Sequence, residues 1–327
     1  MTMKKKLLIS LFLAVVLAGA GADTFVLGTL KGPSGVGLAP MIVEPVTLDN
    51  GIPVEVVALG APDVMVSRII NREVDAAVLP VNLAAKLYNA GQPIRLAAIV
   101  GNGMLSLVSR DTGVGNLADL GGDGVYVAGQ GSTPEFVFRF LLDKAGLSGV
   151  QDRSSGLAST EVGLNFSMPY PEITASIIAG RIDHAVLPEP FATMAVLRGQ
   201  GAIRKAADLQ ELWARVPGNE EDYPMTALVV RRDVVEDEPE TLELVLEAYR
   251  ESLETVLADP QAAGPVVERS GLGLQAPVAA QAIPVTNYVY IPAVESRQKV
   301  EGLLRVFLDF APPSIGGKLP DDGFYLR

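Results

Sequence analysis

Short apolar runs alternate with amphipathic segments along most of the chain, which predicts strands that alternate with helices. Each predicted strand is followed by a turn or by a helix whose apolar residues recur every three or four positions. The predicted strands lie at 24–30, 54–58, 75–79 and 94–100, and the predicted helices lie at 36–46, 62–71 and 81–89. Strands at this spacing pair in parallel through crossover helices, so the sequence predicts an α/β sheet.

A second unit repeats the order of the first. It has predicted strands at 124–128 and 183–188 and predicted helices at 134–145 and 171–179. Its strand DHAVLP at 183–188 matches DAAVLP at 75–80, with Asp, Ala, Val, Leu and Pro recurring in place. Because the match falls where the order of elements also repeats, we interpret it as a structural duplication into two similar α/β lobes.

The chain is predicted to pass between the lobes twice. Similar strand-like segments lie at 107–111 and 228–233, and amphipathic helices then continue towards the C-terminus. These terminal helices need a sheet to cover, which the first lobe offers. We therefore expect a discontinuous first lobe of residues 23–106 plus 228–327. The second lobe, 107–227, is inserted into it, and the two crossings form a hinge.

Residues 1–22 have the pattern of a secretory signal. Lysines at positions 4–6 precede an apolar run at 7–17, and small residues then lead to Ala22. This order predicts export and cleavage after about Ala22. A membrane anchor is the alternative, but the run is shorter than the ~20 residues that a bilayer span needs. Since no cysteine is available for lipid attachment, we expect a protein that diffuses freely in a periplasm.

Composition narrows the chemistry. The 327 residues are 49% apolar and 20% charged, which is typical of a chain that buries a core. They include no cysteine and one histidine, which excludes disulfide frameworks, thiol nucleophiles and multi-histidine metal centres. A net charge of -12 argues against sequence-independent binding of nucleic acid. We therefore expect a monomer that binds a small molecule, with no cofactor and no metal.

Four segments carry a resemblance to a known family. They are KGPSG at 31–35, YVAGQGSTPE at 126–135, LPEPF at 187–191 and GGKLPDD at 316–322. In these segments and in its two-lobe organisation, the chain resembles the periplasmic solute-binding proteins of ABC transporters, in the group that binds nitrate, sulfonates, taurine and thiamine precursors. The resemblance implies a type II periplasmic-binding-protein fold, a ligand in the cleft between the lobes, and delivery to the transmembrane subunits of an ABC permease. Many relatives are lipoproteins, from which this cysteine-free chain departs.

The candidate binding residues lie in loops that follow predicted strands, where α/β sheets bind ligands. They are Lys31, Ser34, Gly35, Asn82, Asn102, Gln130, Ser132, Thr133 and Glu189. Thr133 followed by Pro134 would be a favourable N-cap and first residue of a helix, and free N–H groups at 131–132 would suit an anion. Simple capping of the helix by Ser132 and Thr133 is the other interpretation.

Lys31 and Glu189 are the charged candidates. Lys31 would pair with a carboxylate or sulfonate, unless it is a solvated surface lysine. Glu189 stands between two prolines directly after an apolar strand. It would accept hydrogen bonds from a ligand amine or ring N–H, unless it is a carboxylate on the cleft rim. Asn82, Asn102 and Gln130 would offer amide donors and acceptors.

Two classes of function remain open. The first is a solute receptor whose lobes close on a small ligand. The second is an exported lyase or hydrolase on the same fold, with Glu189 as general base, although the sequence shows no persuasive second catalytic group. His184 is expected to be a structural histidine rather than a catalytic base. Pyrimidine precursors, sulfonates, aromatic carboxylates and small inorganic anions are all compatible with the loops.

Overall fold

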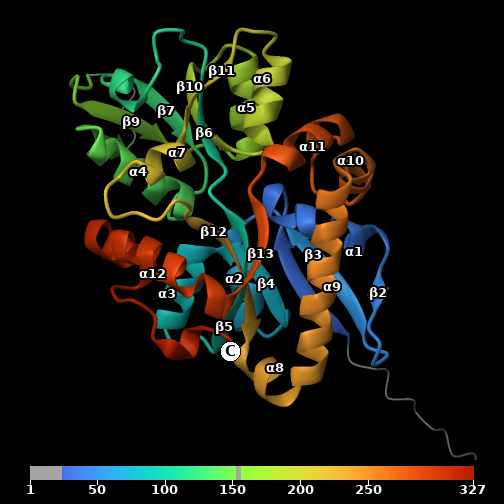
Figure 1. Cartoon of the computed structure of the whole chain (residues 1–327). Helices are drawn as coiled ribbons and strands as arrows, with labels where there is room; N and C mark the ends of the chain where they lie inside the picture. The colour runs from blue at the N-terminus through green and yellow to red at the C-terminus, as the bar shows by residue number, and fades with distance from the viewer. Residues whose placement is uncertain (1–23, 152–155) are drawn as a thin grey trace, which may run out of the picture.

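The computed structural model describes residues 24–151 and 156–327, and the predicted signal segment at 1–22 lies outside these ranges. Within them the strands form a seven-stranded sheet, in the order β13-β5-β12-β4-β1-β3-β2, and a six-stranded sheet, in the order β11-β6-β10-β7-β9-β8 (Figure 1). The larger sheet consists of β1 (Phe25–Leu30), β2 (Val46–Thr47), β3 (Pro53–Leu59), β4 (Ala76–Pro80), β5 (Ile94–Asn102), β12 (Pro224–Arg231) and β13 (Tyr288–Pro292). The smaller sheet consists of β6 (Leu105–Ser109), β7 (Gly124–Val127), β8 (Ser148–Gln151), β9 (Glu161–Asn165), β10 (His184–Pro188) and β11 (Arg204–Asp208).

Helices cover both sheets. They are α1 (Ala39–Val43), α2 (Pro62–Ile70), α3 (Val81–Asn89), α4 (Thr133–Lys144), α5 (Tyr170–Ile178), α6 (Phe191–Arg198), α7 (Leu209–Ala214), α8 (Arg232–Asp237), α9 (Pro239–Ala258), α10 (Pro260–Arg269), α11 (Ala276–Ala282) and α12 (Ala293–Phe310). The helices predicted at 62–71, 81–89 and 134–145 are confirmed to within one residue at each end. In the part of the chain that is described, none combines the length and apolar character needed to cross a bilayer.

One predicted helix, at 36–46, is wrong. Its place is taken by a 3-10 helix at Pro33–Leu38, the short helix α1 and the two-residue strand β2. Gly35 and Gly37 disfavour an α-helix in the first half of the segment. Pro40 fits only the first turn of an α-helix, so α1 starts at Ala39, one residue before it.

The predicted duplication is visible in the order of the strands. In the larger sheet, β4 lies between β1, which runs parallel to it, and β12, which runs antiparallel. In the smaller sheet, β10 lies in the same way between parallel β7 and antiparallel β6. The N–H of Arg231 donates to the Asp75 carbonyl at 2.9 Å, and the N–H of Arg110 donates to the Asp183 carbonyl at the same distance. The two sheets therefore share a topology and a local backbone geometry.

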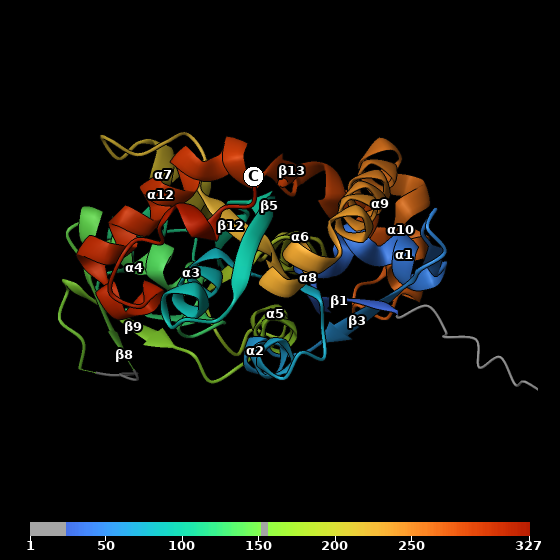
Figure 2. The same ribbon diagram turned by 90° about the horizontal axis from the view of Figure 1, so that it is seen from below.

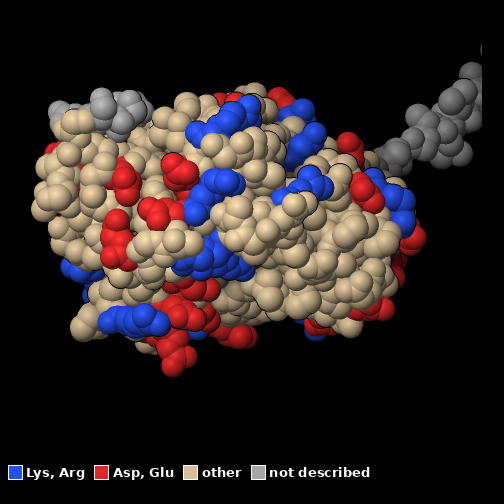
Figure 3. All heavy atoms as spheres, turned by 90° about the horizontal axis from the view of Figure 1, so that it is seen from above, with Lys and Arg blue, Asp and Glu red and all other residues tan. Residues whose placement is uncertain are grey.

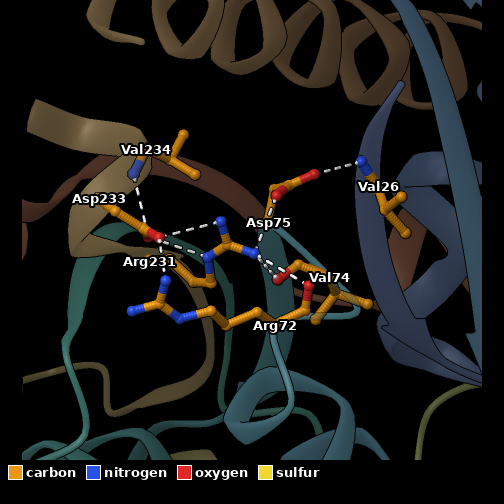
Figure 4. A network of polar contacts seen from close by, with 7 residues as sticks. All are labelled: Val26, Arg72, Val74, Asp75, Arg231, Asp233 and Val234. Carbon is orange, nitrogen blue, oxygen red and sulfur yellow. Dashed lines mark hydrogen bonds and ion pairs between the residues drawn. The ribbon is translucent and has the colours of Figure 1, made fainter. Parts of the chain in front are cut away.

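Ionic contacts fix the end of the larger sheet at which β4 begins (Figure 4). The guanidinium of Arg231 lies 2.9 Å from Asp233 and 3.2 Å from Asp75. It also donates to the carbonyl of Arg72 at 3.2 Å, just beyond α2, while Asp75 accepts a hydrogen bond from the Val26 N–H at 2.7 Å. The Arg231 side chain thus joins β12, the start of β4 and the end of α2. This end of the larger sheet is opposite the end where the loop after β4 lies.

Two connections join the sheets, one from β5 to β6 and one from α7 to β12. Strand β6 begins at Leu105 and β12 at Pro224, so both connections lie a few residues before the lobe boundaries expected at 106/107 and 227/228. Helix α12 lies close to α3 and α4 in both views (Figures 1 and 2). The ring centroids of Phe136 on α4 and Phe307 on α12 are 5.7 Å apart. The apolar core therefore continues from one sheet to the other.

Candidate functional site

The loops that follow β1, β4, β7 and β10 meet between the two sheets. Gly32, in the loop after β1, lies against Phe191, directly after the loop of β10. A Cβ at Gly32 would lie 3.5 Å from the Phe191 ring. The backbone φ of Gly32 is 94°, in the left-handed region that favours glycine. Asn82 after β4 contacts Gly131 after β7. The carboxyl ends of these strands therefore face each other, which is where α/β sheets bind ligands.

The structure brings together two predicted binding residues, Asn82 and Thr133. Their side chains form a hydrogen bond with each other. The Thr133 hydroxyl donates to Asn82 Oδ1 at 3.0 Å. Asn82 Nδ2 donates to the carbonyls of Gly131 at 2.9 Å and Ser314 at 3.3 Å. Both side chains are fully buried. Asn82 therefore links the two halves of the molecule in this arrangement, and its hydrogen-bonding groups already have protein partners.

The N–H groups of the anion site predicted at residues 131–132 have protein partners in this structure. The Gly131 N–H donates to Glu135 Oε2 at 2.7 Å, and the Ser132 N–H donates to the Gly129 carbonyl at 3.0 Å. Glu135 is buried on the first turn of α4, where the helix dipole favours a carboxylate, and its other oxygen is 2.7 Å from Arg139 Nε. A side chain of the same helix therefore takes the Gly131 N–H that the prediction assigned to an anion.

Capping of α4 also differs from the prediction. Ser132, rather than Thr133, is the N-cap residue, and its side chain makes no capping hydrogen bond. Its hydroxyl donates instead to the Gly129 carbonyl. The side chain of Gln130 is exposed. The Ser132 hydroxyl is therefore used within the loop before α4, whereas no contact with the described residues ties the Gln130 side chain to this loop.

The predicted residues of the first loop have separate surroundings. Lys31 is exposed, and its N–H donates to the Leu59 carbonyl at 2.7 Å. Ser34 is half-buried, and its carbonyl accepts a hydrogen bond from the Thr29 hydroxyl at 3.2 Å. At Gly35 a Cβ would lie 2.4 Å from Leu272 Cδ2, so glycine is needed there for close packing. That packing accounts for Gly35 without a ligand.

Glu189 lies at the junction of the two sheets. Only 2% of it is exposed, and its N–H donates to the Met104 carbonyl, in the first connection, at 2.9 Å. One carboxylate oxygen accepts from the Thr193 N–H at 3.1 Å, and the other is paired with Lys205 Nζ. Of the nine predicted residues, Glu189 is the one that lines a cavity of about 340 Å³ between the sheets.

The cavity lies between the smaller sheet and the segment that precedes β13. The smaller sheet and its helices contribute Ser106, Glu189, Lys205, Asp208 and Gln210, the first connection contributes Gly103 and Met104, and the segment before β13 contributes Pro284, Val285, Thr286 and Asn287. The sequence gives no local signal for Lys205, because RKAAD at 204–208 reads as a charged, solvated edge strand. Lys205 reaches Glu189 because β11 and β10 both pair with β6.

Asp222 gathers polar side chains behind this cavity. Its carboxylate accepts hydrogen bonds from Asn102 at 3.4 Å, from Asn287 at 3.2 Å and from Gln210, and Lys299 Nζ lies 3.6 Å away. Asn102, a predicted binding residue, lies at the end of β5, where the first connection begins. Its bond to Asp222 therefore ties the first connection to the second, which runs from α7 to β12. The Oδ1 of Asn102 and the Oε1 of Gln210 are buried with no hydrogen-bond partner among the described residues.

Two tyrosines hold the loops on either side. Burial raises the pKa of both Tyr170 and Tyr288 far above the ordinary value of 10.0, so both phenols stay protonated. Tyr288 on β13 donates to the Pro33 carbonyl at 3.1 Å. Tyr170 donates to the Ala128 carbonyl at 3.4 Å and stacks on Phe191 with ring centroids 5.6 Å apart. His184 is buried and lies 3.1 Å from the Ser109 hydroxyl, as expected of a structural histidine.

A protein-family model, that of the NMT1-like family, matches residues 38–269. The chain belongs to the NMT1-like family. Among solved structures, this NMT1-like protein is 30% identical to an ABC transporter protein from Parabacteroides distasonis, with a TM-score of 0.76. That match covers 93% of this chain and 99% of the other.

Other solved structures share the fold of this NMT1-like protein at lower identity. The aliphatic sulphonate binding protein SsuA from Escherichia coli is 16% identical with a TM-score of 0.68, over 93% of this chain and 92% of that one. The nitrate-binding protein NrtA from Synechocystis PCC 6803 is 16% identical with a TM-score of 0.64, over 88% and 81%. Both are periplasmic proteins, so the predicted periplasmic-binding-protein fold is confirmed. The search of curated proteins found no match.

Proposed function

We propose that the protein is the solute-binding receptor of an ABC importer and holds a small ligand between its two sheets. The observation that carries this proposal is the cavity of about 340 Å³, whose walls come from the smaller sheet and its helices, from the first connection and from the segment before β13. The cavity is open to solvent in this structure, and rotation of the two halves towards each other about the connections would enclose a ligand there. The binding roles of the Escherichia coli and Synechocystis proteins support the same kind of role here.

The proposal includes a place of action and a partner. The protein would be exported to the periplasm, with residues 1–22 removed and no lipid anchor, and would deliver its ligand to the transmembrane subunits of an ABC permease. The periplasmic location of the two relatives supports action outside the cytoplasm. On the face seen in Figure 3, Lys and Arg side chains lie among Asp and Glu side chains, which suits a small ligand better than nucleic acid.

An exported lyase or hydrolase with Glu189 as general base is the competing function. Both carboxylate oxygens of Glu189 already contact protein groups, namely Lys205 and the Thr193 N–H. A general base must reach a substrate proton within hydrogen-bonding distance. In this arrangement neither oxygen is free to abstract a proton, and a ligand would likewise bind Glu189 only beside these partners or in their place.

Native mass spectrometry of the protein as purified tests the receptor function. We expect an added mass of a small molecule that is retained in native conditions and lost on denaturation. The same compound, added back at about a hundred times its Kd, should stabilise the protein by ~2.7 kcal/mol. As a control, the compound is incubated with the protein for a long period and its mass is then measured to detect chemical conversion. An unchanged compound supports a receptor, whereas its conversion would support the enzyme.

A further inference from the structure

We infer that Asp222 is a positioning residue of the hinge. Its carboxylate holds the two halves of the molecule at the angle seen here and fixes two amides of the cavity wall from behind. This inference rests on the proposed function, because it assumes that the halves rotate about the two connections. It adds the group that favours one angle over the others before any ligand binds. The donors around the carboxylate, the elements that carry them and the packing of the connections lead to it.

The carboxylate of Asp222 meets as many donors as it can accept. An ionised carboxylate has two oxygens with about four lone-pair sites between them. Oδ1 accepts from Asn287 Nδ2 at 3.2 Å and from Gln210 Nε2. Oδ2 accepts from Asn102 Nδ2 at 3.4 Å and lies 3.6 Å from Lys299 Nζ. An amide in place of this carboxylate would keep one acceptor oxygen and turn its own N–H groups towards donors, so the charged side chain suits the position and the amide does not.

The four donors come from both halves of the molecule. Asn102 ends β5, Asn287 precedes β13, and Lys299 lies on α12, which packs on β5. Gln210 lies on α7, directly after β11 of the smaller sheet. Asp222, in the second connection, is therefore held to the larger half by three groups and to the smaller half by one. A rotation of the smaller half would stretch the bond to Gln210.

Two of these donors also line the cavity beside Glu189. Gln210 contributes to the wall from the smaller half, and Asn287 contributes from the segment before β13. Asp222 is not a lining residue of this cavity, so it acts on the wall only through these two amides. The Gln210 amide is held further because Nε2 also donates to the Glu221 carbonyl at 2.9 Å. A change of Asp222 would therefore alter the spacing of two parts of the wall that belong to different halves.

The two connections are closely packed at this place. A Cβ at Gly103, in the first connection, would lie 1.7 Å from Gln210 Oε1 and 2.5 Å from Cζ of Tyr223. Tyr223 directly follows Asp222 in the second connection and is fully buried. A side chain at position 103 would have to displace the ring or the amide. Glycine is therefore needed for the arrangement in which Gln210 reaches Asp222.

The distance between two spin labels, one on each half, tests the inference in the ligand-free protein. Because the chain has no cysteine, Ser67→Cys on α2 and Ala175→Cys on α5 provide unique labelling sites at exposed helix positions. Pulsed electron paramagnetic resonance gives the distribution of this distance. We expect a narrow distribution for the labelled protein without further change. Asp222→Asn should raise the population of other distances at least about 5-fold, because a hydrogen bond between the halves is lost.

Gly103→Ala is a second way to disturb the contact, with the carboxylate unchanged. It should broaden the distribution as well, because the added methyl group has no room between the connections. Gly60→Ala is its control, since a Cβ there would meet nothing within 4 Å. Glu221→Gln is the control for Asp222→Asn, since it removes the same charge from the preceding, exposed residue. Neither control should change the distribution. If Asp222→Asn does not fold, Gly103→Ala decides alone.

A double-mutant cycle separates positioning from a general loss of structure. Gln210→Glu alone should broaden the distribution, because two carboxylates then face each other. When it is combined with Asp222→Asn, the new carboxylate can accept a hydrogen bond from the introduced amide. The double variant should therefore have a narrower distribution than Gln210→Glu alone. Two independent structural defects would instead add.

Three results would overturn the inference. The first is an unchanged distribution in both Asp222→Asn and Gly103→Ala, the second is equal broadening in Glu221→Gln, and the third is simple addition of effects in the cycle. In each case the receptor function still stands, because native mass spectrometry tests it separately. If the purified protein retains no small molecule while Asp222→Asn still broadens the distribution, the receptor function fails and the role of Asp222 in the hinge stands.

Discussion

Arg231 and Asp233 illustrate how one side chain sets the protonation of another. A hydrogen bond from the Arg231 guanidinium lowers the pKa of the Asp233 carboxyl below its ordinary value of 3.8, and the nearby positive charges of Arg231 and Arg72 act in the same direction. The ionised carboxylate is therefore favoured by the folded protein. A folded-state pKa below the unfolded value contributes stability at higher pH, and this contribution is lost as the pH falls.

We predict that Asp233→Asn makes the free energy of unfolding less dependent on pH in the acid range. At about pH 7 the variant should be less stable by about 0.5–1 kcal/mol, because a partly exposed ion pair contributes at this level. Towards about pH 3 the difference should shrink, since the carboxyl of the unmodified protein also becomes neutral. Urea unfolding at several pH values measures both curves. Curves that stay parallel across this range would contradict the assigned role of Asp233.

The helices α2 and α5 end in the same way at equivalent positions of the two halves. The residue that follows each helix end by two positions is left-handed, with φ of 61° at Arg72 and 70° at Gly180. In each case an arginine donates to a carbonyl at the helix end at 3.2 Å: Arg231, the last residue of β12, to Arg72, and Arg110, the residue after β6, to Ile177. The second half thus has the residue best suited to this backbone, and the first half does not.

We predict opposite effects of substitution at these two positions. Gly180→Ala should lower the free energy of unfolding by about 1 kcal/mol, because alanine is strained at positive φ. Arg72→Gly should leave it unchanged or raise it by up to about 1 kcal/mol, since the strain is relieved and the lost pair with Asp233, at 3.6 Å, is exposed on the Arg72 side. Urea unfolding of the two variants beside the unmodified protein decides this. Equal destabilisation by both would contradict the proposed equivalence.

Most elements could be predicted from the sequence because their apolar periodicity is strong. The strands predicted at 75–79 and 183–188 are mostly apolar, and the structure has buried strands at Ala76–Pro80 and His184–Pro188. The segment 36–46 was not predicted correctly, because its glycines and proline change the local backbone while its apolar residues remain compatible with a helix. Local propensity outweighed the pattern there.

The candidate site was predictable only where a residue follows a strand directly. Glu189 and Asn82 were predicted in this way, since strand ends of an α/β sheet meet at one edge, and Glu189 lines the cavity. Lys205, Gln210 and Asp222 depend on pairing between segments far apart in the chain, and sequence pattern does not define that pairing. The sequence also did not indicate which group binds the Gly131 N–H. We assigned this N–H to an anion, but it donates to the side chain of Glu135.

At the scale of the whole molecule, Asn82 is a direct polar link between the two halves. It donates to Gly131 and Ser314 and accepts from Thr133, while Asp222 joins the two connections from the other side. These bonds stabilise the arrangement in which the loops touch. They would have to break if the halves rotate apart.

We predict that Asn82→Ala shifts the ligand-free protein towards a more open form. Its radius of gyration in small-angle X-ray scattering should rise, and the Kd of the retained ligand should increase about 5-fold, as expected for the loss of a net hydrogen bond of ~1 kcal/mol. Asn89→Ala is the matched control. Asn89 lies on the same helix and donates at 2.7 Å to the carbonyls of Ile315 and Lys318, which lie in the C-terminal segment after α12. An unchanged radius for Asn82→Ala would show that this link does not hold the halves together.

The position of β12 has a consequence for the order in which the protein is assembled. Strands β4 and β5 do not pair with each other, because β12 lies between them and pairs with both. In the chain, β12 comes after every strand of the smaller sheet. As the polypeptide emerges from its N-terminal end, the smaller sheet therefore has all its strands before the larger one does. Until β12 arrives, β4 keeps one unpaired edge and β5 has neither of its two strand partners, and such edges are where strands of other chains can add.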